Sequence, residues 1–78
     1  MTVHVAIGIV IKEIRKDKGS TIQQISTMTD IPEFTIVHVE DGNQQITVKQ
    51  LFFISHALGC HPRSIINLSD RLLEKFKK

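Results

Sequence analysis

Start and stop signals for helices divide this chain of 78 residues into short segments, and they limit its fold more than any other feature. Two Thr-x-x-Gln quartets, Thr21–Gln24 and Thr47–Gln50, match the capping box, in which the two side chains bond to each other's backbone N–H. Three glycines, Gly19, Gly42 and Gly59, stand where a helix would end in a left-handed residue. These signals predict several helices with short connections.

Apolar residues between these signals recur at spacings of three and four, which predicts amphipathic helices. The expected helices are 7–18, 21–29, 32–41, 47–58 and 62–68, followed by a short C-terminal extension, 69–78, that begins at Ser69-Asp70. Only Thr2–Val5 has a trace of the period-two pattern of a strand. We therefore predict a single all-α domain of five helices spanning residues 1–78.

Composition excludes several classes of protein. The longest apolar stretch, residues 5–11, is shorter than the roughly 20 residues that span a membrane, and no signal peptide precedes it. A phosphate-binding glycine loop is absent, as is a nucleophile with an orienting partner. We expect a cytoplasmic protein that is not an enzyme, does not bind a membrane and needs no cofactor.

The one cysteine, Cys60, cannot form an internal disulfide and lies near His56 and His61. These three residues fall short of the four ligands usual in a closed zinc site. We interpret Cys60 as a core cysteine and expect no metal, with a metal site as the minor alternative.

Two short helices joined at Asp30-Ile31 form the supersecondary unit of helix-turn-helix proteins, although any small helical bundle contains such a pair. The order of motifs along residues 7–66 is more specific: Ile7-Gly8, Ile14-Arg15, Gly19-Ser20-Thr21, Gln24-Ile25, Val39-Glu40-Asp41-Gly42 and Ala57-Leu58-Gly59. In this register the chain resembles the phage repressor/Cro-like (XRE) family of helix-turn-helix transcription regulators. Its Ile-Thr-Val-Lys segment, residues 46–49, also resembles restriction–modification controller proteins, more loosely.

The resemblance implies a lambda-repressor-like domain whose third helix enters the major groove of double-stranded DNA. The residues it would direct to the base edges are Glu33, Phe34, Thr35 and His38. Hydroxyl and imidazole groups can hydrogen-bond to bases, a carboxylate can accept from cytosine, and a phenyl ring can touch a thymine methyl group. The alternative is a solvated helix face. The expected recognition helix contains no lysine or arginine.

Phosphate contacts are expected at the start of the second helix and in the loop before the fourth. The residues concerned are Gln23, Asn43, Gln44, Gln45 and Lys49. With a net charge of only +2, few cations would face the phosphates, which predicts a shallow salt dependence. The alternative for residues 43–45 is a hydrophilic loop without a ligand.

The resemblance also implies a partly buried salt bridge between Arg15 and Glu40. Arginine suits such a position because its planar guanidinium binds a carboxylate through two hydrogen bonds. The bridge would hold the recognition helix against the first helix. The alternative is two surface charges that contribute little to stability.

Apolar residues in the C-terminal part predict a homodimer. We expect its interface to include Phe53, Leu72, Leu73 and Phe76, unless the tail folds back onto its own core. A two-fold dimer would present two recognition helices about 34 Å apart and would bind a roughly palindromic operator. The predicted function is therefore that of a small dimeric repressor or autoregulating controller. The alternative, favoured by Glu33, Glu40, Asp41 and the low net charge, is a protein-interaction module such as an antitoxin or adaptor.

Overall fold

The computed structural model describes residues 1–76 of the chain. Over these residues it contains five helices and no strand: α1 (Val3–Asp17), α2 (Ile22–Thr29), α3 (Glu33–Glu40), α4 (Val48–Ala57) and α5 (Pro62–Lys75). The all-α, five-helix fold expected from the sequence is confirmed.

The capping signals begin helices where the sequence placed them. The Thr21 hydroxyl accepts a hydrogen bond from the Gln24 N–H at 3.0 Å, and the Gln24 side chain accepts one from the Thr21 N–H at 2.8 Å. Thr47 and Gln50 repeat the arrangement at the start of α4, with both bonds at 3.0 Å. Because these bonds involve neighbouring residues only, they can be predicted from local sequence.

The first helix begins earlier than predicted. Thr2 caps α1 by accepting a hydrogen bond from the Val5 N–H at 3.4 Å, so the helix starts at Val3 rather than at residue 7. The period-two trace over Thr2–Val5 was therefore misleading. Gly8, which we placed near the start of the helix, lies in its interior, where glycine is a poor helix former.

The separate C-terminal extension is also wrong within the described residues, because α5 runs without a break to Lys75. Ser69 does not begin a new turn. Its buried hydroxyl donates to the Ile65 carbonyl at 2.7 Å, one turn back in the same helix, which satisfies the hydroxyl without a change of direction. Residues 77–78 of the predicted extension lie outside the described residues.

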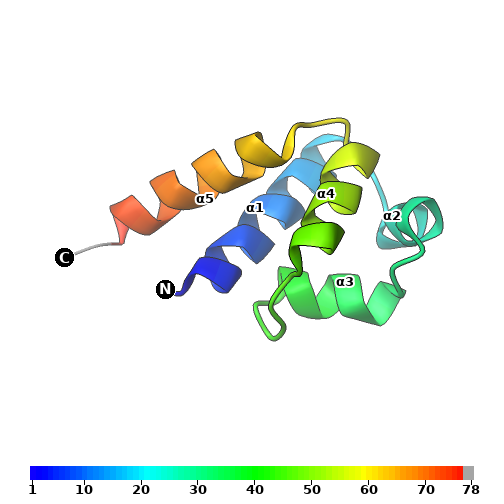
Figure 1. Cartoon of the computed structure of the whole chain (residues 1–78), viewed down its shortest axis with the longest axis horizontal. Coiled ribbons are helices and arrows are strands. Elements are labelled where there is room, and N and C mark those ends of the chain that lie inside the picture. Colours follow the sequence, from blue (N-terminus) through cyan, green and yellow to red (C-terminus); the bar gives the residue numbers. More distant parts are fainter. Residues whose placement is uncertain (77–78) are drawn as a thin grey trace.

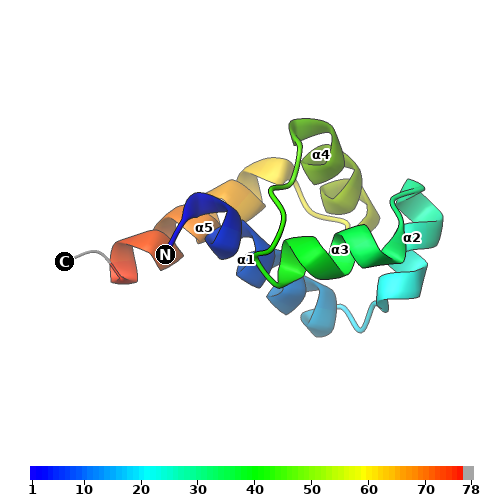
Figure 2. The same ribbon diagram turned by 90° about the horizontal axis from the view of Figure 1, so that it is seen from below.

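The helices are arranged so that α3 lies along one side of the molecule. The helix α1 packs against α5 and α3, while α2 packs against α3 and α4 (Figure 1). Seen from below, α3 stands in front of the other helices (Figure 2). The core beneath it is aliphatic: Val10, Ile11, Ile25, Ile31, Ile36, Val39, Leu51, Ile54, Leu58 and Ile65. No helix within residues 1–76 is long and apolar enough to cross a membrane.

A glycine permits the close crossing of α1 and α3. Gly8 is buried, and a Cβ atom built on it would collide with the carbonyl oxygen of Val39 and lie 3.1 Å from that of Glu40. Backbone oxygens at a helix end cannot swing aside as a flexible side chain can. Gly8 therefore sets how closely the C-terminal end of α3 approaches α1.

Candidate functional site

An ion pair connects α1 to the end of α3. The Arg15 Nε donates to Glu40 Oε2 at 2.7 Å and its Nη2 donates to Oε1 at 2.9 Å, which is the two-bond geometry expected for this pair. The two side chains are only 13% and 4% exposed. The predicted salt bridge is present, and it is partly buried, with the carboxylate of Glu40 more enclosed than the guanidinium.

The same guanidinium also reaches the loop before α2. Arg15 Nη1 donates to the Ser20 carbonyl at 3.1 Å, so one side chain connects α1, the α1–α2 loop and α3. The hydrogen bond to Glu40 raises the pKa of Arg15 above its ordinary value, against the opposite effect of burial. The arginine therefore remains charged while it orients α3.

The turn between α2 and α3 is held by side-chain hydrogen bonds. The Ser26 hydroxyl donates to the Ile31 carbonyl at 2.6 Å, and the Ile31 N–H donates to the Thr29 hydroxyl at 3.2 Å. Asp30 takes the left-handed conformation at φ 60°, which aspartate tolerates better than most residues. Because Ile31 is also buried in the core, the start of α3 has a defined position.

The outward face of α3 includes three of the four predicted base-contact residues. Glu33, Phe34 and His38 are exposed, and Phe34 is 65% exposed. Thr35 is only 8% exposed and faces inward beside Ile36, so the sequence assigned it to the wrong face. The reason is periodicity: residues 35, 36, 39 and 40 form the inner face, and the outer face takes positions 34, 37, 38 and 41.

Sequence reasoning missed Val37 on this outer face. Its side chain is 39% exposed, three residues after Phe34 and next to His38. The spacing of three from Phe34 was the available signal. The Phe34 and His38 rings lie edge to face, with centroids 6.2 Å apart and planes at 68°.

The predicted phosphate-contact residues lie at two helix starts. Gln23 is exposed in the first turn of α2, and Asn43 and Gln45 are exposed in the loop before α4, whereas Gln44 is half-buried. Lys49 is exposed in the first turn of α4. Its Nζ lies 5.7 Å from the centroid of the Phe53 ring, within range of a cation–π interaction.

A hollow of about 610 Å³ separates the α2–α3 turn from the start of α4. Its lining includes Met28 and Pro32 from the turn side and Lys49, Gln50 and Phe53 from α4. Lys49 is therefore beside the helix-turn-helix unit, and Phe53 packs near that unit rather than near the C-terminus.

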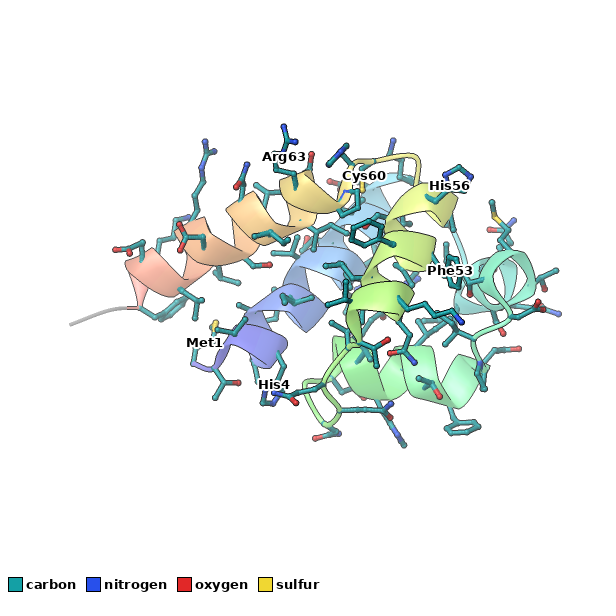
Figure 3. The ribbon with its side chains drawn as sticks, in the orientation of Figure 1. Met1, His4, Phe53, His56, Cys60 and Arg63 are labelled. Atoms are coloured by element: carbon teal, nitrogen blue, oxygen red, sulfur yellow. The ribbon has the colours of Figure 1, made fainter. Side chains whose placement is uncertain are left out.

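The residues of the alternative metal site lie in the α4–α5 connection and at the helix ends beside it. His56, Cys60 and His61 form no group of three that could hold a metal ion in the described part of the chain. His61 instead caps α5, because its Nδ1 accepts a hydrogen bond from the Arg63 N–H at 3.0 Å. Figure 3 shows Cys60 in the α4–α5 connection. It packs partly against the core, and burial raises the pKa of its thiol.

The four predicted dimer residues do not form one continuous surface. Phe53 points out between α4 and α2, far along the long axis from the C-terminal end of α5, where Phe76 lies beside Met1 (Figures 1 and 3). Leu72 packs partly against the protein's own core, as the fold-back alternative expected. Only Leu73 and Phe76 share a region.

A different apolar surface lies beside the loop that leads out of α3. It surrounds a groove of about 390 Å³ between the N-terminal part of α1, the start of α4 and α5. The exposed side chains Val3, Val48 and Ile66 line this groove, together with the half-buried Ile7 and Leu73. We call these five residues the α1–α4–α5 groove.

The fold and the buried ion pair define a small domain of the helix-turn-helix class. The pattern of the helix-turn-helix family matches residues 11–65, more than half of the chain. The chain belongs to this XRE-type, phage repressor/Cro-like family.

Solved structures of regulators have the same fold. The clp gene regulator ClgR from Corynebacterium glutamicum is 20% identical, with a TM-score of 0.86 over 90% of this chain and 91% of that chain. The restriction–modification controller protein C.AhdI from Aeromonas hydrophila is 21% identical, with a TM-score of 0.76 over 80% and 94%.

A second controller protein, C.Esp1396I, is 21% identical, with a TM-score of 0.86 over 96% of this chain and 97% of that chain. A tetramer of that protein has been solved in complex with its natural 35 base-pair operator. Among curated proteins, none matches this chain by sequence.

Proposed function

We propose that this protein binds double-stranded DNA in a sequence-specific manner and regulates transcription as a small dimeric regulator. The observation that carries the proposal is the uncovered face of α3. The ion pair of Arg15 with Glu40 and the hydrogen-bonded α2–α3 turn orient this helix, and its outward side chains Glu33, Phe34, Val37 and His38 are exposed. In helix-turn-helix proteins this helix enters the major groove.

The base contacts would come from Glu33, Phe34 and His38, with Val37 taking the position first assigned to Thr35. His38 can donate to or accept from a base edge. Gln23, Lys49 and the loop residues 43–45 would contact phosphates on either side, since exposed amides and one cation flank the helix. A cytoplasmic location accords with this function.

The α1–α4–α5 groove is our proposal for the dimer interface. It adjoins the loop after α3, so a two-fold axis through it would bring the C-terminal ends of two α3 helices toward each other. Two such helices about 34 Å apart would read a roughly palindromic operator. Sedimentation of Ile66→Glu and of Phe53→Glu tests this: the first variant should be monomeric at concentrations where the second and the wild type are dimers. A monomeric wild type, alone and with operator DNA, would refute the dimer.

Selection of bound sequences from random DNA by the purified protein tests the function. We expect enrichment of one symmetric motif. On that motif, His38→Ala should weaken specific binding more than binding to unrelated DNA, because base contacts carry sequence information. Met28→Ala is the matched control, since Met28 is exposed on α2 and is assigned no DNA contact. No enrichment at low salt would reject the proposal.

The second candidate remains a protein-interaction module, such as an antitoxin or adaptor. Of the three acidic residues that favoured this candidate, Glu40 forms the ion pair with Arg15, and only Glu33 and Asp41 are exposed. Heparin or bulk DNA distinguishes the two functions. Retention at low salt that is lost with added salt supports DNA binding, whereas co-purification of a protein partner without retention supports the module.

A further inference from the structure

The helix α3 is apolar on two opposite faces. Ile36 and Val39 are buried in the core, while Phe34 and Val37 are exposed on the outer side. Exposed apolar side chains that adjoin one another on an outer face often mark an interaction site. Here the outer face is uncovered within the described residues, and α3 packs only against α1 and α2. This face is therefore expected to be covered when the protein is at work.

The exposed apolar side chains form an ordered ridge. Phe34, Val37 and His38 are spaced i, i+3 and i+4, so they adjoin on one side of the helix. The edge-to-face contact with the His38 ring favours one orientation of the Phe34 ring. Less side-chain freedom then has to be lost when the ridge meets its ligand.

Charge determines which features of DNA this ridge can recognise. Residues 33–41 contain no lysine or arginine, so α3 cannot make the two-bond contact to guanine that those side chains make most often. The base-edge feature that apolar side chains recognise in the major groove is the 5-methyl group of thymine. A phenyl ring and an isopropyl group one turn apart suit two such methyl groups.

We propose that Phe34 and Val37 recognise the 5-methyl groups of neighbouring pyrimidines, so that α3 selects thymine-containing half-sites largely by apolar contact. This inference rests on the proposed DNA-binding function and names the chemical feature that the same site reads. His38 then supplies a hydrogen bond to an adjacent base. Because 5-methylcytosine carries its methyl group at the same ring position, the contact also responds to cytosine methylation.

The test uses the motif obtained by selection, with each thymine replaced in turn by deoxyuracil, which lacks only the methyl group. For wild-type protein we expect affinity to fall about fourfold at each contacted thymine, the value of one buried methyl-sized group. Where a contacted T·A pair is replaced by C·G, 5-methylation of that cytosine should raise the affinity by a similar factor. Replacing a thymine outside the motif with deoxyuracil should leave the affinity unchanged.

Variants assign the effect to the ridge. Phe34→Ala should bind thymine and deoxyuracil duplexes equally well at its contacted position, whereas Phe34→Leu should keep part of the preference. Met28→Ala, whose side chain is 64% exposed on α2, should keep all of it. Since Phe34 is exposed, thermal melts of these variants should match the wild type.

Different failures have different meanings. Specific binding with equal affinity for thymine and deoxyuracil throughout the motif would overturn the methyl readout and leave the proposed function standing. A preference that survives in Phe34→Ala at the position assigned to Phe34 would also overturn it, because a residue outside the ridge contact would then read that methyl group. Failure to bind any DNA at low salt would instead reject the proposed function.

Discussion

Removal of either partner of the Arg15–Glu40 pair should strongly destabilise the domain. Each single alanine variant leaves a charge without its partner in a largely enclosed site, because the two side chains are 13% and 4% exposed. Breaking a buried pair in this way costs about 3–5 kcal/mol. For a domain of this size, 1 kcal/mol changes Tm by about 4–8 °C, so we expect Tm to fall by about 12–40 °C.

The hydrogen bonds of this pair predict which variants lose more stability. Arg15→Ala should cost more than Glu40→Ala, because it removes the bond to the Ser20 carbonyl as well and leaves the more buried carboxylate alone. Glu40→Gln keeps the shape and one acceptor for the guanidinium, but it removes the counter-charge and sets an amide NH2 against a guanidinium N–H, so it should cost less than Glu40→Ala and still lower Tm measurably. The double variant Arg15→Met/Glu40→Leu removes both charges and should be more stable than either alanine variant.

Thermal unfolding, monitored by circular dichroism at several denaturant concentrations, measures these differences in stability. A double-mutant cycle isolates the coupling free energy between Arg15 and Glu40. Glu13→Ala, on the exposed side of the same helix, is the control and should melt like the wild type. If Arg15→Ala and Glu40→Ala also melted like the wild type, the pair would behave as a solvated surface pair, and the argument from burial would be wrong.

Three further predictions concern a close contact, a thiol and a cation. Gly8→Ala should lower Tm, because the added Cβ would collide with the Val39 carbonyl oxygen. This cost should exceed the gain of about 1 kcal/mol from the better helix propensity of alanine, and a raised Tm would contradict the prediction. Cys60 should react with iodoacetamide more slowly than free cysteine at pH 7, because burial raises its pKa and lowers the thiolate fraction. The rate, followed by mass spectrometry, should still rise with pH where that of free cysteine has levelled off, and equal rates at pH 7 would contradict this. Lys49→Ala should reduce the slope of log affinity for DNA against log salt concentration by about one, whereas His38→Ala should leave that slope unchanged. Fluorescence anisotropy at several salt concentrations measures the slope for each variant.

Local signals in the sequence determined the helix count and most helix ends. The capping boxes at Thr21 and Thr47 involve residues three apart, and the left-handed Asp30 depends on a single side chain. Such features are independent of distant packing, so sequence is enough to predict them. The pair of Arg15 with Glu40 was predicted across 25 residues only because the family register implied it.

Tertiary packing decided which face of each helix is exposed. Thr35 and Val37 are the clear case: the family register directed Thr35 toward the DNA and left Val37 without a role, whereas the packing of α3 against α1 and α2 buries Thr35 and exposes Val37. In a helix of eight residues, a shift of one position turns the expected outer face by about 100°, and apolar residues on both sides remove the usual signal.

The same reason explains Gly8, Ser69 and the predicted dimer surface. The sequence pattern shows that Gly8 lacks a side chain, but only the crossing with α3 shows why none fits. Ser69 looked like a helix start until its bond to Ile65 placed it inside α5. Phe53 and Phe76 are both apolar and exposed, yet they lie far apart along the molecule, because distance between elements is a property of the whole fold.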